Sequence, residues 1–510
     1  MRKSPPFAGQ GRPRSAWIWG GLAVAGLAAA AAGSLHLAGD RASQPVAAAE
    51  PLRRSTFDAL RPAPQSAAPG LTLAPRSAGA ERQEVRGYAE AMWNAIALFD
   101  SGKALPSDKL CFEDDGSISR TDYTFITNVG AYTWSILGAR DLGLIGDQAA
   151  RQKLLPLLDA IETLQTKSAA AGAPGGLMTW AAKIDGPRID GTTISSVDNA
   201  WLAAGLALIA EAYPLLKPRA EAILARMDFA SLLHSGKGQF HNNYDLGTRA
   251  FSNGTYDLLT EARFISYLAI GEGKVPGSQY FRVERWPSWR GQNNPAQFRT
   301  YEGVRVYEHT LTYGGQRFQP SWGGSMFESF MPYLLIPETQ WAPDSWGRSH
   351  PQMAAAQVRF GLDNHGYWGF SPSMIPATRG YTEYGAPPMG IGGYSPLGEN
   401  LAARAGPVVT PHAVFLPIEF EPAAALANLR KLRASFPGVY DQRYGFRDSV
   451  DVQTGKVSQC MLLLDQAMAF GAMVNYLTDG GLRRYLGGRY ANRLQPLIGQ
   501  EQFWYPEAGR

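Results

Sequence analysis

The amino-acid sequence predicts an all-α protein built as a helical toroid, and three observations support that fold class. Apolar residues recur at close to the 3.6-residue spacing of a helix in one segment after another from about residue 84 onward. Segment 199–213 is apolar on almost every side, which is typical of a helix with neighbours all around it. About 425 residues shared among about a dozen helix-plus-loop units give about 35 residues per unit, and no strict repeat favours an open solenoid. We therefore expect inner and outer helices in a ring, with a cleft built by loops at one rim.

The N-terminal residues have the pattern of an export signal. Arg2, Lys3, Arg12 and Arg14 precede segment 15–39, which contains no Lys, Arg, Asp or Glu. A basic flank stays on the cytoplasmic side while the apolar segment after it enters the membrane. The segment is longer than the about 20 residues that a membrane helix needs, so we expect an uncleaved signal anchor, with a cleaved signal peptide as the alternative.

Composition divides the chain into three parts. Residues 1–39 are the predicted anchor or signal peptide, 40–83 form a predicted flexible linker rich in Ala, Pro, Arg and Ser, and 84–510 form the helical domain. The expected location is the inner membrane, with a single N-terminal span and a domain facing the periplasm. If the segment is cleaved, the protein is instead periplasmic or secreted.

Within the domain, apolar periodicity marks the expected helices, and the loops between them are long and rich in aromatic residues, Gly and Pro. The longest of these loops are 234–257, 274–322 and 364–411. The expected helices are 84–99, 131–144, 153–164, 199–213, 219–233, 258–270, 326–335, 353–362, 422–434, 461–477 and 481–494.

Composition and charge exclude several classes of function. The chain is 45% hydrophobic and 18% charged, which is typical of a globular protein and not of a disordered one. Residues 1–80 hold nine Lys and Arg against three Asp and Glu, a surplus of +6, so the net charge of +4 for the whole chain leaves −2 for the remainder. We therefore expect no nucleic-acid partner. The seven histidines are scattered without a metal-ligand spacing, so we expect no metal and no cofactor. Cys111 and Cys460 suffice for one disulfide, and the sequence leaves open whether they pair.

A series of motifs in one order resembles a known family. The motifs occupy 127–143, 194–203, 256–263, 321–328, 368–371, 444–448 and 465–466. They are similar to motifs of the glucoamylase-like domain of cyclic β-1,2-glucan synthases and of the related endo-β-1,2-glucanases, over about residues 85–480. No single motif is specific, but their order is. The resemblance implies an (α/α)6 toroid that acts on glycosidic bonds of an oligosaccharide or polysaccharide. It is also compatible with an association with polysaccharide-synthesis machinery.

Hydrolysis of a glycosidic bond needs two carboxyl groups, one that protonates the leaving oxygen and one that activates water or attacks the sugar. The resemblance implies that Glu261 is the general acid and Asp448 the general base. Taken alone, Glu261 could be a first-turn acid that complements a helix dipole, and Asp448 could be an Asx turn or helix cap. Arg447 replaces a Tyr that is usual in the family, and we expect this cation to lower the pKa of Asp448.

Further residues are candidates for substrate binding. Asp198 heads an apolar helix and could cap it or bind sugar hydroxyls. Glu328 and Glu383 could bind hydroxyls, or could be solvated or structurally paired acids. Aromatic rings offer apolar faces to sugar C–H groups, although ordinary core packing is the alternative for each ring. The expected substrate-binding residues are Asp198, Trp180, Trp322, Glu328, Trp368, Tyr381, Glu383, Tyr384 and Arg447.

Two departures from the family pattern bear on mechanism. In the synthases, the Trp-Gly-Ile-Ser motif is followed by a Glu that serves retaining transglycosylation, whereas Pro372 follows Ser371 here. The segment around Trp180 also differs, lacking the family's acid two residues after the Trp. We therefore expect an inverting hydrolase of a β-glucan, with a β-1,2 linkage as the first guess. The alternatives are a transglycosylase or trimming factor in polysaccharide synthesis, and an inactive polysaccharide-binding or assembly protein.

Overall fold

The computed structural model describes residues 78–285, 297–391 and 406–505. The predicted signal segment 15–39 and most of the predicted linker lie outside these residues. Helix α1 (Ala78–Asp100) starts inside the range 40–83, so the predicted linker boundary is wrong. The cause is that the buried stripe of α1 begins only at Val85, which hides its first turns from a periodicity argument. None of the helices in the described residues is both long and apolar enough to cross a membrane.

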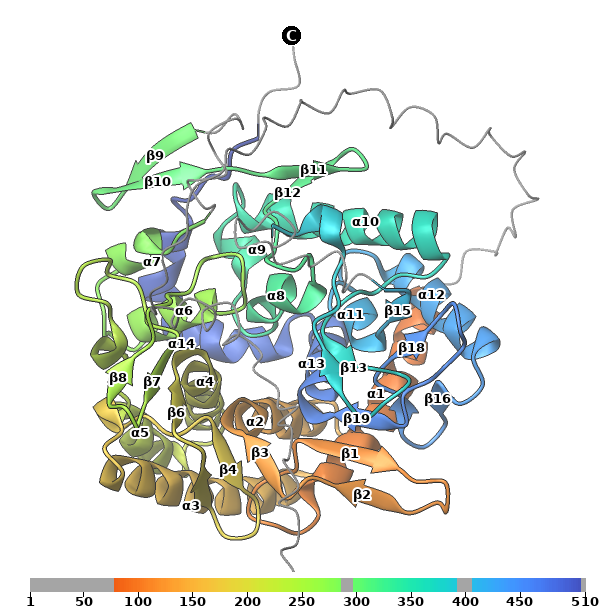
Figure 1. The fold of residues 1–510 in the computed structure, drawn as a ribbon, viewed down its shortest axis with the longest axis horizontal. Coiled ribbons are helices and arrows are strands. Elements are labelled where there is room, and N and C mark those ends of the chain that lie inside the picture. Colours follow the sequence, from red (N-terminus) through yellow and green to blue (C-terminus); the bar gives the residue numbers. More distant parts are fainter. Residues whose placement is uncertain (1–77, 286–296, 392–405, 506–510) are drawn as a thin grey trace, which may run out of the picture.

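Buried helices alternate with flanking helices along the chain (Figure 1). Within the described residues, six helices are buried along most of their length, and one flanking helix precedes each of them in the order that a toroid of paired helices requires. The buried helices are α2 (Ile126–Asp141), α4 (Ser196–Ala212), α6 (Arg263–Gly271), α8 (Met326–Phe330), α11 (Pro411–Phe415) and α13 (Leu463–Thr478). The flanking helices are α1, α3 (Asp147–Ala170), α5 (Lys217–Arg226), α7 (Ser278–Arg282), α10 (Trp346–His365) and α12 (Pro422–Ser435), and two more are α9 (Glu338–Trp341) and α14 (Gly481–Ile498).

Helix α14 lies across the C-terminal ends of the buried helices. It packs against α2, α4, α6 and α13. Its Arg489 binds Glu211 at the end of α4 and Glu272 at the end of α6, both at 2.7–2.9 Å, and its Tyr485 binds Asp141 at the end of α2. A cation beside helix C-termini is favourable because it complements the helix dipoles. Since α14 closes this end, a ligand must approach from the end where the buried helices begin.

Short strands lead into several buried helices, which the all-α prediction did not include. Each strand has two to five residues and belongs to a sheet of two or three strands, while helices make up about half of the described residues. Strands this short carry no readable alternation of apolar and polar residues. The three-stranded sheets are β19-β1-β2, β3-β4-β5 and β6-β7-β8, and all strand pairs are antiparallel. The strands are β1 (Lys109–Phe112), β2 (Ile118–Arg120), β3 (Tyr123–Phe125), β4 (Ala181–Lys183), β5 (Arg188–Asp190), β6 (Thr193–Ser195), β7 (Asn243–Asp245), β8 (Ala250–Phe251), β9 (Gln297–Tyr301), β10 (Val304–Glu308), β11 (Leu311–Tyr313), β12 (Gln316–Phe318), β13 (Ser373–Met374), β14 (Tyr381–Thr382), β15 (Val408–Val409), β16 (Tyr440–Asp441), β17 (Gly445–Phe446), β18 (Val450–Asp451) and β19 (Cys460–Leu462).

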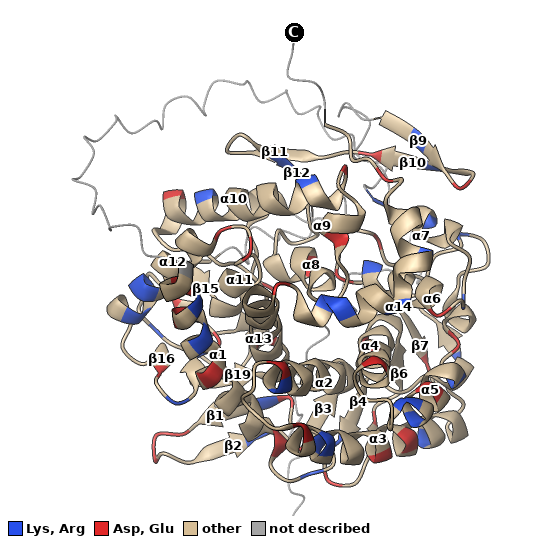
Figure 2. Ribbon diagram, turned by 180° about the vertical axis from the view of Figure 1, so that it is seen from behind, with Lys and Arg blue, Asp and Glu red and all other residues tan. Residues whose placement is uncertain are grey.

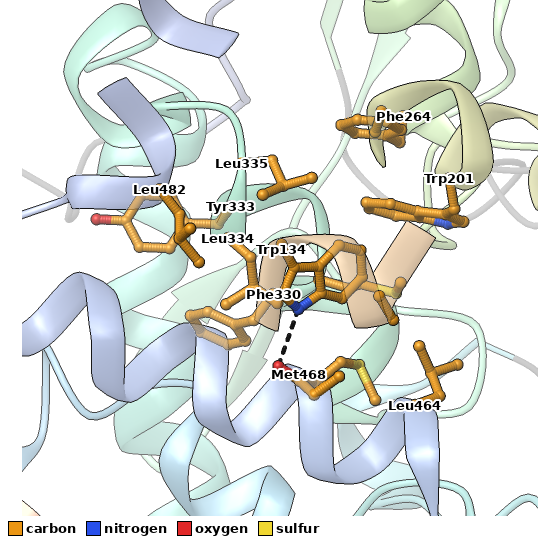
Figure 3. Close-up of a cluster of buried hydrophobic side chains, with 14 of the residues drawn as sticks. Trp134, Trp201, Phe264, Phe330, Tyr333, Leu334, Leu335, Leu464, Met468 and Leu482 are labelled. Atoms are coloured by element: carbon orange, nitrogen blue, oxygen red, sulfur yellow. Dashed lines mark hydrogen bonds between the residues drawn. The ribbon is translucent and has the colours of Figure 1, made fainter. Parts of the chain in front are cut away.

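Aromatic side chains fill the space enclosed by the buried helices (Figure 3). Trp201 of α4 stacks on Phe264 of α6, with ring centroids 4.0 Å apart and an angle of 8° between the rings. The indole N–H of Trp134 in α2 donates to the Ala467 carbonyl in α13 at 3.0 Å, so this large ring is buried with its one polar group bonded. These contacts tie α2, α4, α6 and α13 together.

Glycine allows α2 and α4 to approach each other closely. A Cβ atom on Gly130 of α2 would lie 2.2 Å from the Trp201 carbonyl oxygen of α4, and one on Gly205 of α4 would lie 3.0 Å from Gly130 Cα. Only glycine fits at such a contact between two helix backbones. This pair therefore fixes the spacing of the two helices that carry one side of the site.

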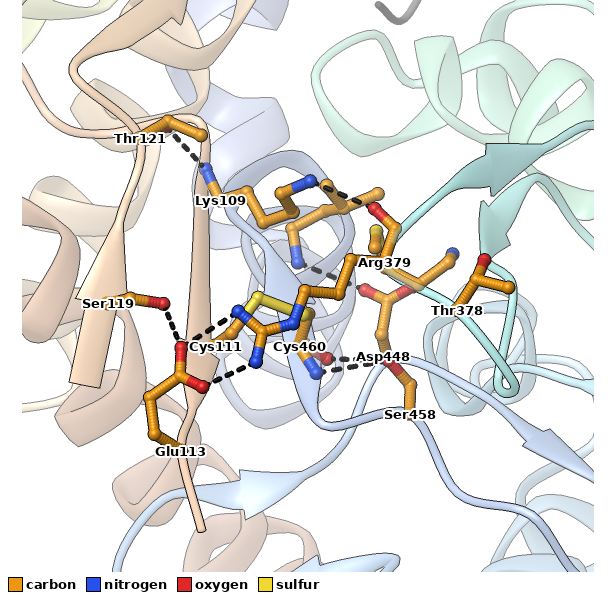
Figure 4. Close-up of a disulfide and its surroundings, with 12 residues drawn as sticks. Lys109, Cys111, Glu113, Ser119, Thr121, Thr378, Arg379, Asp448, Ser458 and Cys460 are labelled. Carbon is orange, nitrogen blue, oxygen red and sulfur yellow. Dashed lines mark hydrogen bonds and ion pairs between the residues drawn. A yellow bond between two sulfur atoms is a disulfide. The ribbon is translucent and has the colours of Figure 1, made fainter. Parts of the chain in front are cut away.

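One disulfide joins segments far apart in the sequence (Figure 4). Cys111 of β1 and Cys460 of β19 face each other across the antiparallel pair, with Cα atoms 3.9 Å apart and a sequence separation of 349. The sequence left this pairing open. The bond fastens the strand that leads into α13 to the segment that follows α1.

Charged residues of both signs are interspersed over the outer helices (Figure 2).

Candidate active site

A cavity with an empty volume of about 730 Å³ opens where the buried helices begin. Many of its lining residues lie near the starts of α2, α4, α8 and α13 or at the ends of the short strands that lead into buried helices. Glu261 lines it from just before α6. Helix N-termini direct unpaired N–H groups and a partial positive charge at such a space. Eight side chains of the described lining residues carry a carboxyl or hydroxyl group: Asp108, Thr127, Ser195, Asp198, Tyr256, Glu261, Tyr381 and Asp465.

Glu261 is the most strongly desolvated acid of the lining. It is 2% exposed, and burial raises the pKa of its carboxyl well above the usual value, with the charges of Glu328 and Asp198 adding to the rise. Its surroundings therefore favour the protonated form of the carboxyl. The direction of this shift agrees with the role of proton donor that the sequence predicted, and the helix begins only at Arg263, so Glu261 precedes the first turn.

Arg263 holds this segment in place without neutralising Glu261. Its guanidinium donates to both carboxylate oxygens of Glu338, at 2.8 and 3.1 Å, and to the carbonyls of Glu328 and Ser329 in α8. It also lies 4.1 Å from the Trp346 ring centroid. Because the ion pair is buried and its donors are used on other groups, α6 and α8 are fastened together beside the cavity.

Asp198 lines the cavity from the first turn of α4, but it does not cap the helix. The N-cap is Ser195, whose hydroxyl oxygen accepts the Asp198 N–H at 3.3 Å, so the capping alternative for Asp198 is wrong. An N-cap side chain accepts the N–H of the second or third helical residue, and Asp198 is itself that third residue. The carboxylate of Asp198 accepts from the Thr127 hydroxyl at 2.6 Å, which fixes it at the cavity wall, where it can accept from ligand hydroxyls.

Asp448 is 1% exposed and is not among the described residues that line the cavity. Its Oδ2 accepts the Met374 N–H at 2.7 Å and its Oδ1 accepts the Leu462 N–H at 3.1 Å. Burial raises the pKa of Asp448 to about 6, and the two N–H groups oppose that rise. A carboxyl held in this way can be ionised at neutral pH.

Arg447 does not act on Asp448 as the sequence predicted. Its guanidinium lies 3.4 Å from the ring centroid of Phe112, and Asp441 is the acid that influences its pKa. The pKa of Asp448 is raised rather than lowered, so the predicted effect of Arg447 is wrong. The guanidinium is thus directed to the Phe112 ring and not to the Asp448 carboxylate.

Asp465 and Asp108 belong to the site, although the sequence argument gave neither a role. Asp465 lies in the first turn of α13, is 5% exposed and lines the cavity. Burial and the neighbouring Asp448 raise the pKa of Asp465 well above its usual value. Asp108 accepts from the Asn128 amide at 2.8 Å. The signal that could have found Asp465 is an acid in the first turn of an otherwise apolar helix, directly after a buried strand.

Two of the predicted aromatic residues line the cavity. Trp180 packs edge-on against Phe125, with centroids 5.6 Å apart. Tyr381 lies close enough to Glu383, Asp465, Glu261 and Asp448 for their charges to raise the pKa of its hydroxyl, together with burial. Its hydroxyl therefore stays protonated and can donate to a ligand.

The other predicted binding residues lie elsewhere. Trp368 is 1% exposed and packs on Gly361 in the core, so its predicted role in substrate binding is wrong: the motif is conspicuous in sequence because the ring fills the interior. Glu328 forms a capping box with Ser325, accepting its hydroxyl at 2.9 Å, which is the structural alternative. Trp322, Glu328, Trp368, Glu383, Tyr384 and Arg447 are not among the described residues that line the cavity.

Pro372 does line the cavity. The position at which the synthases carry an acid is thus part of the wall here, and it has no proton to transfer. Among the described residues, no three His, Cys, Asp or Glu side chains are arranged to hold a metal ion.

Paired helices around a cavity with one protonated and one ionisable carboxyl define a protein suited to acid–base chemistry on a polar ligand. Comparison with known proteins shows what the chain is similar to. The family model named Glycoamylase, which describes glucoamylase-like proteins, matches residues 257–486. The cyclic β-(1,2)-glucan synthase NdvB of Rhizobium meliloti is 26% identical over 342 residues, which is 64% of this chain and 11% of that protein. The chain thus spans about a tenth of the length of this relative.

Solved structures show the same fold at low sequence identity. An endo-β-1,2-glucanase from Chitinophaga pinensis, in complex with sophorotriose and glucose, matches with a TM-score of 0.60 and 14% identity over 83% of this chain and 98% of that chain. An endo-β-1,2-glucanase from Talaromyces funiculosus with sophorose matches with a TM-score of 0.59 and 14% identity over 82% of this chain and 92% of that chain. The chain is thus similar to glucoamylase-like proteins over residues 257–486, and it shares its fold with endo-β-1,2-glucanases.

Proposed function

We propose that the protein hydrolyses a β-glucan with inversion at the anomeric carbon, and that a β-1,2-linked glucan is its substrate. The observation that carries the proposal is a cavity wall that holds Glu261, whose surroundings favour the protonated form, and Asp465 in the first turn of α13, with the Asp448 carboxyl in contact with that of Asp465. The choice of linkage rests on the similarity to proteins named for β-1,2-glucan.

In this proposal Glu261 gives its proton to the glycosidic oxygen as the bond to the anomeric carbon breaks. Asp448 supports the removal of a proton from the water that attacks the same carbon from the opposite face. The two carboxyls begin the reaction in opposite protonation states because burial and the neighbouring acids outweigh the one backbone N–H that favours the charged form of Glu261, whereas two backbone N–H groups favour the charged form of Asp448.

Pro372 supports hydrolysis over transglycosylation. A retaining reaction needs a carboxylate that attacks the sugar or a base that serves both halves of the reaction. The wall position that carries an acid in the synthases is a proline here, which leaves inversion by water as the preferred course.

The test is incubation of the purified protein with linear and cyclic glucans of different β linkages, followed by mass analysis of the products. We expect shorter oligosaccharides from β-1,2-glucan, and turnover lowered by about 10² to 10⁴ in Glu261→Gln, because general acid catalysis is lost. Products heavier than the substrate indicate transglycosylation instead. Binding without any product from any glucan indicates a polysaccharide-binding protein.

We also propose that the protein is exported and faces the periplasm, anchored in the inner membrane through segment 15–39, where it could act beside polysaccharide-synthesis machinery. The basic flank of that segment supports export. The Cys111–Cys460 disulfide supports an oxidising compartment, since such bonds persist there and are rare in the cytosol. Cell fractionation tests the location: recovery of the full-length protein in the cytosol would contradict it.

A further inference from the structure

Asp465 separates the cavity from Asp448. Asp465 lines the cavity, whereas Asp448 is buried and is not part of the lining. Both oxygens of Asp448 already accept backbone N–H groups, from Met374 and Leu462. Water in the cavity therefore meets the carboxyl of Asp465 before it can meet that of Asp448.

The two oxygens of Asp465 differ in their surroundings. Oδ2 is buried, and no N–H or O–H donor forms a hydrogen bond to it. His412 Nδ1 lies 3.3 Å from it, and burial lowers the pKa of His412 to about 3, so this imidazole is neutral. The Thr410 hydroxyl donates to the Asp448 carbonyl and therefore accepts the Nδ1–H of His412 at 2.8 Å, which directs that proton to Thr410. A buried carboxyl oxygen without a donor is best accommodated as the O–H of a neutral acid. This assignment leaves Oδ1 for the cavity side.

Asp448 is the acceptor within reach of that O–H group. The carboxyls of Asp465 and Asp448 interact through a hydrogen bond and through their charges, and this interaction, together with burial, raises the pKa of Asp465 well above its usual value. The proton resides on Asp465, because the Met374 and Leu462 N–H groups stabilise the charge on Asp448.

We propose that Asp465 relays the proton of the attacking water to Asp448. Resting on the proposed function, the step is a concerted transfer: water adds its oxygen to the anomeric carbon and gives one proton to Oδ1 of Asp465, while the Oδ2 proton of Asp465 moves to Asp448. Glu261 protonates the leaving oxygen. Asp465 ends the step neutral, as it began, and Asp448 ends it protonated, so one carboxylate has taken up one proton.

The test compares two substitutions at the same position with the full-length parent on a glucan that the parent cleaves. Asp465→Asn fills the same space but cannot relay a proton, so kcat should fall by about 10² to 10⁴ with KM changed only a few-fold. The kcat of Asp465→Ala should fall by as much. Added formate should raise the kcat of this variant at least about tenfold, because it supplies a small carboxyl in the vacated space. Formate should not restore Asp465→Asn, where that space is filled.

Additional variants separate a relay from a structural role. The double variant of Asp465→Asn and Asp448→Asn should be no slower than the slower single variant, because the two groups act as a unit. Asp451→Asn, the same charge change at an acid on the far end of β18, should leave kcat unchanged. Melting temperatures near that of the parent show that the variants are folded.

Each contrary result has a distinct meaning. Asp465→Asn turnover within about threefold of the parent overturns the relay while leaving the proposed function intact. Loss of turnover that is additive with Asp448→Asn, or that formate does not restore in Asp465→Ala, also overturns it. A parent that cleaves no glucan overturns both this inference and the proposed function.

Discussion

Individual carboxyl groups acquire different properties at this site from their immediate contacts. Glu261 is buried beside other acids, and a single backbone N–H favours its charged form, so its pKa rises far. Asp448 is equally buried, but two backbone N–H groups hold its pKa to about 6. Burial alone therefore does not decide which acid donates a proton; the number of donors around each one does.

The pH dependence of activity follows from these contacts. Asp448 must be ionised in the free enzyme, so kcat/KM should fall as pH drops below about 6, whereas Glu261 stays protonated and keeps the activity up to higher pH. Initial rates on the cleaved glucan between about pH 4 and pH 9 measure this fall of kcat/KM on the acid side. The residual activity of Asp448→Asn should not show that fall. Full activity of the parent at about pH 4 would show that no group with the pKa of Asp448 limits the reaction.

Secondary-structure elements place these residues by bringing helix N-termini to one end of the ring. Short strands such as β6 and β19 run into buried helices, so a residue at the junction or in the first turn faces the cavity. Helix α14 closes the opposite end with Arg489 on the helix C-termini. Helix spacing and cavity lining depend on different residues, so each can be tested by its own substitutions.

Helix spacing depends on Gly130. In Gly130→Ala the new Cβ meets the Trp201 carbonyl oxygen at 2.2 Å, so α2 and α4 must move apart, and the free energy of unfolding should fall by about 1 to 3 kcal/mol or more. The matched control is Gly87→Ala in the exposed face of α1, where nothing lies within 4 Å of the new atom. That variant should gain about 0.5 to 1 kcal/mol, since alanine favours a helix. Chemical denaturation measures both, and equal changes would contradict the account of the contact.

The disulfide should stabilise the fold and support the base. It closes a loop of 349 residues, and its β19 strand supplies the Leu462 N–H to Asp448. Replacing both Cys111 and Cys460 with Ser should lower the free energy of unfolding by about 2 to 4 kcal/mol and reduce turnover. Reductant should have the same effect on the parent and none on the double variant. An unchanged denaturation midpoint of the reduced parent would refute this role.

For the whole molecule, the sequence predicted the fold better than the site. Fully apolar segments such as 199–213 identified a helix with neighbours on all sides, and α4 occupies that place. Strands of two to five residues gave no periodic signal. Glu261 and Asp198 were found because motif order pointed to them, whereas the role of Asp465 depends on which carboxyl faces the cavity, a property of packing between β19, α11 and α13. Trp368 shows the converse, since a conspicuous ring proved to be part of the core.

Global stability should be greatest in mildly acidic solution. Burial raises the pKa of Asp257 and Glu328 to about 7 in the folded protein, so their stabilising contribution is complete below their unfolded pKa near 4 and is lost as pH rises through about 7. Glu338 acts in the opposite sense: its pKa is lowered to about 2, and its contribution is lost as pH falls toward that value.

The melting temperature should therefore decline between about pH 5 and pH 8. Asp257→Asn keeps an oxygen to accept the Leu259 N–H but removes the titration, so its decline should be shallower. Thermal unfolding followed by circular dichroism gives both curves. A melting temperature that climbs steadily to about pH 8 would show that these acids are not protonated in the folded state.

The central claim is that a protonated Glu261 and a water activated through Asp448 act on opposite faces of one β-glycosidic bond. The most direct measurement is proton NMR of the first products formed from a β-1,2-glucan, recorded faster than the sugar anomers interconvert. Inversion predicts that the new reducing end appears first as the α anomer, and that Glu261→Gln forms it slower by about 10² to 10⁴. A β anomer formed first, or product formation by Glu261→Gln at the rate of the parent, would contradict the account.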